Sequence, residues 1–190
     1  MIDNQDAGKE WKTSKIVDSV RCVKGTVRDV PDFPEPGILF KDITPLLGDA
    51  KAFDHTISVL VERYKNAGID AIVPVESRGF LFGAPLAREL RKAIVPVRKP
   101  GKLPAATLSV DYELEYGTNS MEIHADGLKK GQKVLILDDL LATGGTLAAS
   151  AQLVEMAGGT VTEIAVIIEL LFLEGRKNLA GYEIYSMIQY

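Results

Sequence analysis

The chain has 190 residues, of which 46% are hydrophobic and 25% are charged, as is typical of one globular domain with a single core. Its formal net charge of −4 disfavours a nucleic-acid-binding protein, because such proteins hold phosphates with an excess of Lys and Arg. The single cysteine, Cys22, excludes a disulfide within the chain and predicts a reducing, cytoplasmic compartment, and no apolar run is long enough to span a membrane.

The N-terminal part of the chain contains two predicted segments. Residues 1–26 form an N-terminal extension. Its first residues are polar and lack the apolar core of a signal peptide, and the spacing of apolar residues over Trp11–Val23 predicts an amphipathic helix. Residues 27–47 contain four prolines, which favour an extended, folded-back loop. That segment is either a surface loop pinned by its aromatic side chains or a lid that covers a flat ligand.

Strands and helices alternate from residue 48 onward. This alternation predicts an α/β fold with an open parallel sheet flanked by helices, within one domain of residues 1–190. Ligands of such sheets bind beyond the carboxyl ends of the strands. Asp49 is the expected N-cap of the first helix. The predicted strands are 71–75, 94–97, 134–137, 161–168 and 182–187, and helices are expected around 53–64, 86–93 and 147–154.

Two polar or basic segments follow predicted strands, and both should therefore lie at the ligand-binding edge. A run of charges is most often a solvated surface. The position of these segments favours a pyrophosphate site. Arg can donate two hydrogen bonds to one phosphate group, and Lys attracts a phosphate as a point charge. The segments contain Glu76, Ser77 and Arg78 after the first strand, and Arg98, Lys99 and Lys102 after the second.

The stretch 107–124 is long and weakly patterned, with two short β-prone pieces at its ends. A connection of this length inside a compact domain is usually a functional lid or a disordered segment. Glu113 and Glu115 are candidate proton acceptors in this stretch. The alternative interpretation is that they are solvated loop acids.

The most informative stretch reads KVLILDDLLATGGT. Val134–Leu137 predicts a buried strand that ends at Asp138 and Asp139, and the turn Ala142–Thr146 then leads into a helix. Free N–H groups and the dipole at a helix start favour a phosphate. Gly145 stands where a nucleoside-triphosphate P-loop requires lysine. The neighbouring acids instead favour a ribose 5-phosphate, because carboxylates accept hydrogen bonds from sugar hydroxyls.

The segment LDDLLATGGT (137–146) resembles the phosphoribosyl-pyrophosphate (PRPP) motif of the type I phosphoribosyltransferases, and its form is similar to that of the adenine phosphoribosyltransferases. The resemblance extends from about Val27 to Tyr190. Its other motifs are FPEPGILFKDITPLL (33–47), VESRGF (75–80), VRKPGKLP (97–104) and LEYG (114–117).

This resemblance implies a cytoplasmic, homodimeric enzyme that converts adenine and PRPP to AMP and pyrophosphate. Residues 27–47 would form a hood over the adenine, and residues 48–190 the core. Mg²⁺ would be held by PRPP and water, with no direct protein ligand. The resemblance also implies a cis peptide bond between Glu76 and Ser77, and Arg98 and Lys102 could serve a partner subunit's site.

The resemblance further implies roles for individual residues, which fall into four groups. The catalytic group is Glu115, as acid or base, and Tyr116, as a cover. Asp138 and Asp139 would bind the ribose hydroxyls, and Ala142, Thr143, Gly144, Gly145 and Thr146 the 5-phosphate. The pyrophosphate group is Glu76, Ser77, Arg78, Arg98, Lys99 and Lys102, and the adenine group is Leu39, Phe40 and Lys41.

Two alternative functions are considered beside this one. One is a phosphoribosyltransferase for a 6-oxopurine (hypoxanthine, guanine or xanthine), against which the hood segment argues. The other is a non-catalytic regulator that senses PRPP and binds nucleic acid. The acidic composition and the absence of an added DNA-binding domain argue against this second alternative.

Overall fold

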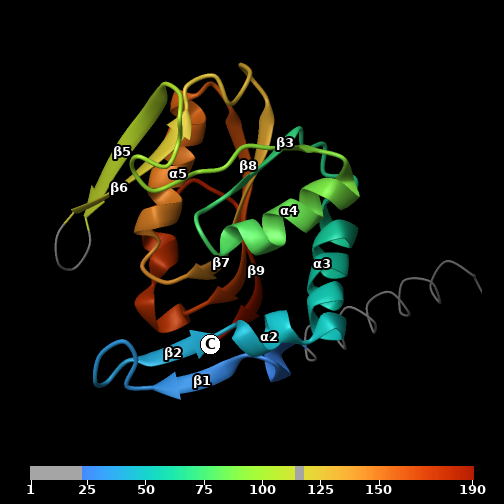
Figure 1. Ribbon diagram of the computed structural model, residues 1–190, viewed down its shortest axis with the longest axis vertical. Coiled ribbons are helices and arrows are strands. Elements are labelled where there is room, and N and C mark those ends of the chain that lie inside the picture. Colours follow the sequence, from blue (N-terminus) through green and yellow to red (C-terminus); the bar gives the residue numbers. More distant parts are fainter. Residues whose placement is uncertain (1–22, 114–117) are drawn as a thin grey trace, which may run out of the picture. The chain divides into compact units, whose positions relative to one another are not determined.

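The computed structural model describes residues 23–113 and 118–190 (Figure 1). The chain divides into two compact units, Met1–Arg63 and Tyr64–Tyr190. The helix predicted over Trp11–Val23 lies outside the described residues, except for its last residue. No helix in the described part of the chain is both long enough and apolar enough to cross a membrane.

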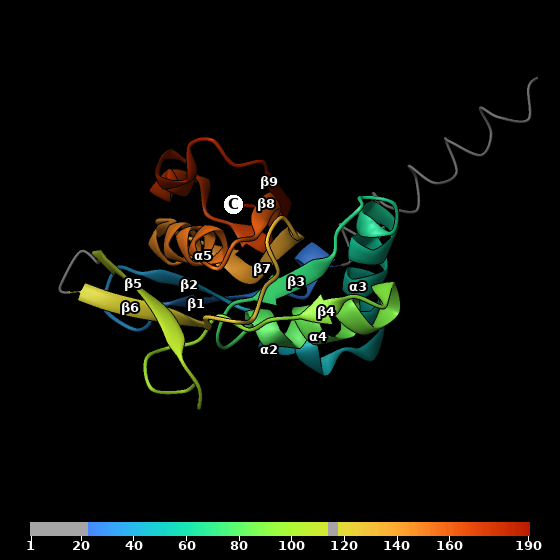
Figure 2. The ribbon, with the colours of Figure 1, turned by 90° about the horizontal axis from the view of Figure 1, so that it is seen from above.

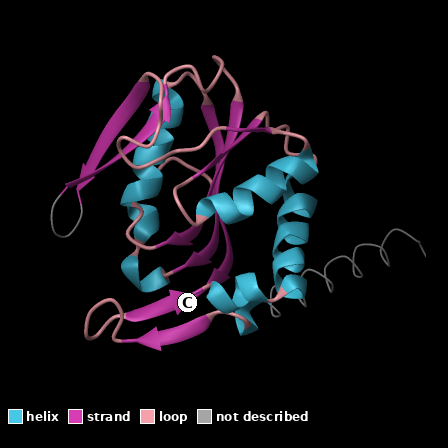
Figure 3. Ribbon diagram, in the orientation of Figure 1, coloured by secondary structure: helices cyan, strands magenta, loops and turns pink. Residues whose placement is uncertain are grey.

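The proline-rich segment of the first unit forms an antiparallel hairpin and a short helix (Figure 3). Strand β1 (Arg28–Pro31) pairs with β2 (Leu39–Asp42), so the predicted folded-back loop is confirmed. The chain then forms α2 (Thr44–Gly48), which the sequence analysis did not predict and which tolerates Pro45 because that residue lies in its first turn. Helix α3 (Ala50–Tyr64) follows.

Two carboxylates organise the ends of these elements. The Asp49 carboxylate accepts hydrogen bonds from the backbone N–H groups of Lys51 and Ala52 at 2.9 and 3.1 Å, which confirms Asp49 as the cap of α3. Asp42, at the end of β2, accepts hydrogen bonds from Thr44 and from Arg28. These bonds lower the pKa of the Asp42 carboxyl to about 2, so the carboxylate stays charged over the physiological range.

The second unit is built on a five-stranded, all-parallel sheet. In spatial order its strands are β4 (Ala93–Ile94), β3 (Ala71–Pro74), β7 (Lys133–Leu141), β8 (Thr160–Glu169) and β9 (Ile184–Gln189). Helix α4 (Gly79–Leu90) contacts β3 and β7, and α5 (Gly145–Met156) contacts β7 and β8. The two helices lie on opposite faces of the sheet (Figure 2). The predicted open parallel sheet is therefore confirmed.

Strand β7 continues further than the sequence analysis predicted. The expected strand ended at Leu137, whereas β7 runs through the two acids to Leu141. The reason is its neighbour, because β8 extends to Glu169 and pairs with Asp138, Leu140 and Leu141. The acids are therefore part of the sheet rather than of a loop.

Residues 107–113 and 118–124 form a second two-stranded ribbon, where the sequence predicts a long and weakly patterned connection. Strand β5 (Thr107–Glu113) pairs antiparallel with β6 (Thr118–His124), and both strands contact α5. The apolar side chains of β5 pack against the main core cluster, which includes Val73, Ile136 and Val166 of the sheet. The C-terminal region adds two short 3-10 helices, η1 (Leu171–Leu173) and η2 (Gly175–Leu179), before β9.

Candidate functional site

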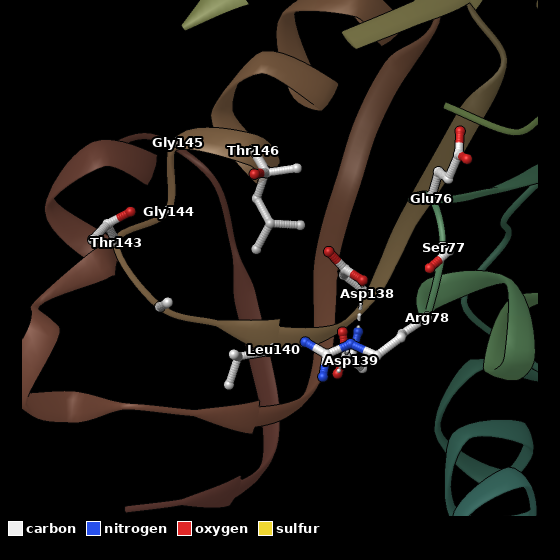
Figure 4. Close-up of a pocket in the computed structure, with 12 residues that line it drawn as sticks. Glu76, Ser77, Arg78, Asp138, Asp139, Leu140, Thr143, Gly144, Gly145 and Thr146 are labelled. Atoms are coloured by element: carbon white, nitrogen blue, oxygen red, sulfur yellow. Dashed lines mark hydrogen bonds and ion pairs between the residues drawn. The ribbon is translucent and has the colours of Figure 1, made fainter. Parts of the chain in front are cut away.

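A pocket of about 230 Å³ lies at the carboxyl ends of β3 and β7 (Figure 4). The turn that opens α5 forms one side of this pocket, the segment between β3 and α4 forms the other, and the two acids of β7 lie between them. Segments that the sequence predicts at one edge of the sheet are thus brought together. The lining residues are Glu76, Ser77, Arg78, Asp138, Asp139, Leu140, Ala142, Thr143, Gly144, Gly145, Thr146 and Leu147.

The turn before α5 exposes backbone donors to the pocket. Helix α5 begins at Gly145, and the N-cap Gly144 has φ 88°, a conformation that glycine adopts without a steric penalty. A Cβ atom on Gly144 would also lie 2.4 Å from the carbonyl oxygen of Gly175 in η2. The first N–H groups of a helix lack intrahelical partners, so this turn can bind an anion.

The two acids of β7 share one nearby cation. The Arg78 guanidinium lies with its Nε 3.0 Å from an Asp139 carboxylate oxygen, and the Asp139 side chain is 5% exposed. The Asp138 carboxylate accepts a hydrogen bond from the backbone N–H of Asp139 at 2.9 Å. Burial raises the pKa of both carboxyls, and the charge of Asp139 raises the pKa of Asp138 further. The pair would therefore gain from a ligand that donates hydrogen bonds.

Glu76 connects the pocket to the basic segment 98–102. Its carboxylate accepts hydrogen bonds from Arg98 Nε at 3.1 Å and from the backbone N–H of Lys99 at 2.9 Å. Burial opposes ionisation of Glu76, but these donors together lower its pKa. Arg98 also donates to the backbone carbonyl of Lys102 at 3.1 Å. The peptide bond between Glu76 and Ser77 is cis, as expected.

The comparisons with known proteins agree on one family. A model of the phosphoribosyl transferase domain matches residues 45–183. The adenine phosphoribosyltransferase of Chloroflexus aurantiacus is 58% identical over 164 residues, which cover 86% of this chain and 95% of that protein. The chain belongs to the adenine phosphoribosyltransferase family.

Solved structures of the family show the same fold. The adenine phosphoribosyltransferase of Thermoanaerobacter pseudethanolicus matches with a TM-score of 0.87 and 57% identity, over 90% of this chain and 99% of that one. The enzyme from Saccharomyces cerevisiae, complexed with an imino-altritol bisphosphate and adenine, matches with a TM-score of 0.86 and 38% identity, over 90% and 99% of the two chains.

Eight of the predicted family residues either do not line the pocket or lie outside the described residues. Arg98, Lys99 and Lys102 belong to the basic segment that contacts Glu76, but they are not among the lining residues. Leu39, Phe40 and Lys41 belong to β2 in the first unit. The Phe40 ring contacts the Phe33 ring edge to face, with 5.1 Å between centroids, and the buried Lys41 ammonium pairs with Asp29 at 2.6 Å. Glu115 and Tyr116 lie outside the described residues. 

Several residues next to the turn before α5 were not predicted from the sequence. Leu140 and Leu147 line the pocket. Asn178 of η2 donates to the backbone carbonyl of Thr143 at 2.8 Å, and the hydroxyls of Thr146 and Tyr112 form a hydrogen bond at 3.0 Å. Asn178 and Tyr112 are more than 30 positions from their partners, so no local pattern could have found them.

Proposed function

We propose that this chain is an adenine phosphoribosyltransferase that transfers the phosphoribosyl group of PRPP to adenine, forming AMP and pyrophosphate. Membership of the family supports this activity. The observation that carries it is the pocket in which two sheet carboxylates lie opposite the turn that opens α5. This arrangement fits a sugar that carries a terminal phosphate. The single cysteine fits a reducing, cytoplasmic location.

The turn and the acids would hold the two ends of the ribose 5-phosphate. The N–H groups of Ala142–Thr146 and the hydroxyls of Thr143 and Thr146 are donors for the phosphate, which only accepts hydrogen bonds. Asp138 and Asp139 would accept hydrogen bonds from the ribose hydroxyls. These bonds favour the charged form of each carboxyl and would offset the burial that raises its pKa.

The pyrophosphate would lie beside Ser77 and Arg78, with Arg98, Lys99 and Lys102 supplying further positive charge. A carboxylate repels pyrophosphate, so we assign to Glu76 the role of holding Arg98 and the backbone of Lys99 in place. The family resemblance supports a homodimer, in which Arg98 and Lys102 could also serve the partner subunit's site.

The proposed reaction uses Mg²⁺, which prefers oxygen ligands and usually retains several waters while it binds substrate phosphates. PRPP and water would hold the ion without a direct protein ligand, and the Asp138 and Asp139 carboxylates that line the pocket would make the site favourable for a cation. Bound with PRPP, the ion would neutralise charge on the departing pyrophosphate. The protein's own contribution would be to orient the sugar. It would do so by binding the 5-phosphate, which lies at the other end of the ribose from the reacting anomeric carbon.

In the reaction, a nitrogen of adenine forms a bond to the anomeric carbon while the bond to pyrophosphate breaks. Positive charge develops on the sugar, so fixed charges that stabilise the leaving group lower the barrier. Glu115 would accept the proton that the adenine loses, and Tyr116 would cover the site. Leu39, Phe40 and Lys41 of the hood would contact the adenine, as the family resemblance implies.

Incubation of the purified chain with adenine, PRPP and Mg²⁺ tests the proposal, with chromatography to detect AMP and a coupled assay to detect pyrophosphate. We expect both products in equal amounts and only with adenine. Parallel reactions with hypoxanthine, guanine and xanthine provide the control. Turnover of a 6-oxopurine in preference to adenine would replace the proposed substrate, and DNA binding without turnover of any base would indicate a regulator.

A further inference from the structure

In the turn 142–146, the Oγ1 of Thr146 donates a hydrogen bond to the hydroxyl of Tyr112 at 3.0 Å. Tyr112 belongs to β5, 34 positions earlier. Both side chains are half-buried, and Thr146 lines the pocket whereas Tyr112 does not. Tyr112 thus contacts a proposed phosphate-binding residue without lining the pocket itself.

The framework around Tyr112 fixes the position of its hydroxyl. The residue is paired with Asn119 in the β5–β6 ribbon, β5 contacts α5, and the Tyr112 side chain packs against the main core cluster. Because the ring is held on one side by the core, its hydroxyl can reach Thr146 without fixing a freely moving side chain. The pair therefore meets the requirement of preorganisation in a binding site.

The chemistry of the two hydroxyls suggests what this contact does when a ligand binds. Each hydroxyl has one proton to donate and can accept as well, whereas a phosphate oxygen accepts only. If the Thr146 proton turns to the phosphate, its bond to Tyr112 must reverse, and Tyr112 can then donate to Thr146 Oγ1. Hydrogen bonds arranged in such a chain strengthen one another.

We propose that Tyr112 is a positioning residue for the 5-phosphate of the substrate, which acts by donating its hydroxyl proton to Thr146 while Thr146 donates to the phosphate. This inference rests on the proposed function, because it requires the phosphate to lie at the turn before α5. It concerns binding rather than the chemical step, since the terminal phosphate keeps the same contacts throughout the reaction.

Tyr112→Phe removes the hydroxyl and keeps the ring in the core. We expect the Kd for AMP, measured by calorimetry, and the KM for PRPP to rise about three- to tenfold, the value of one hydrogen bond. The kcat should be unchanged, as for a loss of uniform binding. Inorganic pyrophosphate, which would bind elsewhere in the site, should keep its affinity.

Tyr182→Phe is the matched control. Tyr182 also packs against the main core cluster, and its hydroxyl donates to Glu155 at 3.0 Å, away from the pocket. This variant should keep the wild-type KM and Kd. Equal loss of AMP affinity in both variants, or a loss of thermal stability in Tyr112→Phe without any change in AMP affinity, would show that Tyr112 is only a structural contact.

A double-mutant cycle tests whether Tyr112 acts through Thr146. Thr146→Val removes the linking hydroxyl, and adding Tyr112→Phe to it should cause no further loss of AMP affinity, whereas Thr146→Ser should retain the effect of Tyr112→Phe. Losses that simply add in the double variant would overturn the inference. Failure of the wild-type chain to bind AMP would overturn the proposed function itself, so the two failures are distinguishable.

Discussion

Two adjacent carboxylates at a pocket floor are costly unless something neutralises them. Asp138 and Asp139 are close to one guanidinium, that of Arg78, and burial raises the pKa of both carboxyls. In the absence of a ligand this pair therefore weakens folding rather than stabilising it. Hydroxyl donors on a sugar would relieve that cost, and the acids would then contribute to ligand affinity at the expense of the stability of the free protein.

Asp139→Asn tests this exchange. It removes a charged hydrogen-bond acceptor, so we expect kcat/KM for PRPP to fall about 10- to 100-fold. The thermal unfolding midpoint should not fall, because burial disfavours the Asp139 charge that is removed, whereas the Arg78 side chain left behind is 36% exposed and can be solvated. Asp126→Asn, in an exposed turn, is the control and should change neither quantity. Unfolding of Asp139→Asn would assign the residue a structural role instead.

Glu115→Ala tests the proposed proton acceptor. Loss of a general base should lower kcat by about 10²- to 10⁴-fold, while the Kd for PRPP stays unchanged because Glu115 is assigned to the adenine side of the reaction. Glu113→Ala is the matched variant two positions away, since Glu113 is the other candidate. Equal losses of turnover and PRPP affinity in Glu115→Ala, or a larger turnover loss in Glu113→Ala, would contradict the assignment.

Among the elements, η2 supports the turn that opens α5 from behind. Asn178 holds the backbone carbonyl of Thr143, and Gly175 approaches so closely that a Cβ atom on it would lie 2.2 Å from the carbonyl oxygen of Ala142. The turn thus takes its shape from the contact between two backbone segments as well as from its own glycines. A larger residue on either side of this contact would separate them.

Gly144→Ala should reveal this backbone contact. Its added carbon would lie 2.4 Å from the Gly175 carbonyl oxygen at φ +88°, whereas in Gly158→Ala, at φ +90°, the nearest heavy atom lies at 3.4 Å. Both variants share the cost of a left-handed alanine, about 1–2 kcal/mol. We expect Gly144→Ala to lose about 1–3 kcal/mol more, by urea unfolding, and to raise the KM for PRPP. Equal destabilisation of the two variants would argue against close packing on η2.

At the scale of the whole molecule, local pattern predicted the parallel sheet and the edge at which the site forms. It failed where long-range pairing decides the outcome. The extension of β7 beyond Leu137 depends on β8, and the ribbon of β5 and β6 depends on pairing between two weakly patterned segments. Likewise, the ion pair between Glu76 and Arg98 joins residues 22 positions apart, so the spacing of residues within one helix or strand cannot predict it.

Ionisation of Glu169, the buried residue that ends β8, should make the free energy of unfolding depend on pH. Hydrogen bonds from Arg176, then Ser186 and Gln189, lower its pKa from 4.5 to about 2. A depressed pKa adds stability that is fully present above pH 4.5 and is lost as the pH falls toward 2. Glu169→Gln should cost about 1–3 kcal/mol at neutral pH.

Urea unfolding at a series of pH values measures this contribution. The stability difference between the wild-type chain and Glu169→Gln should shrink steadily below pH 4.5. Glu174→Gln is the control, because Glu174 pairs with Lys177 at the exposed surface and should have little effect at any pH. A difference that stays constant down to pH 2 would indicate that the Glu169 carboxyl is already protonated or that its packing alone matters.

The continuation of β7 through Asp138 and Asp139 has a consequence for selectivity. A loop can shift to follow a differently sized guest, but a central strand hydrogen-bonded along its length cannot move without distorting its neighbours. The spacing between these acids and the turn before α5 is therefore fixed by the sheet, and under the proposed function it would select for the length of a pentose 5-phosphate. Hexose phosphates should fail to fit, whereas changes at the departing group or at the incoming base, which meet other segments, should be tolerated more readily.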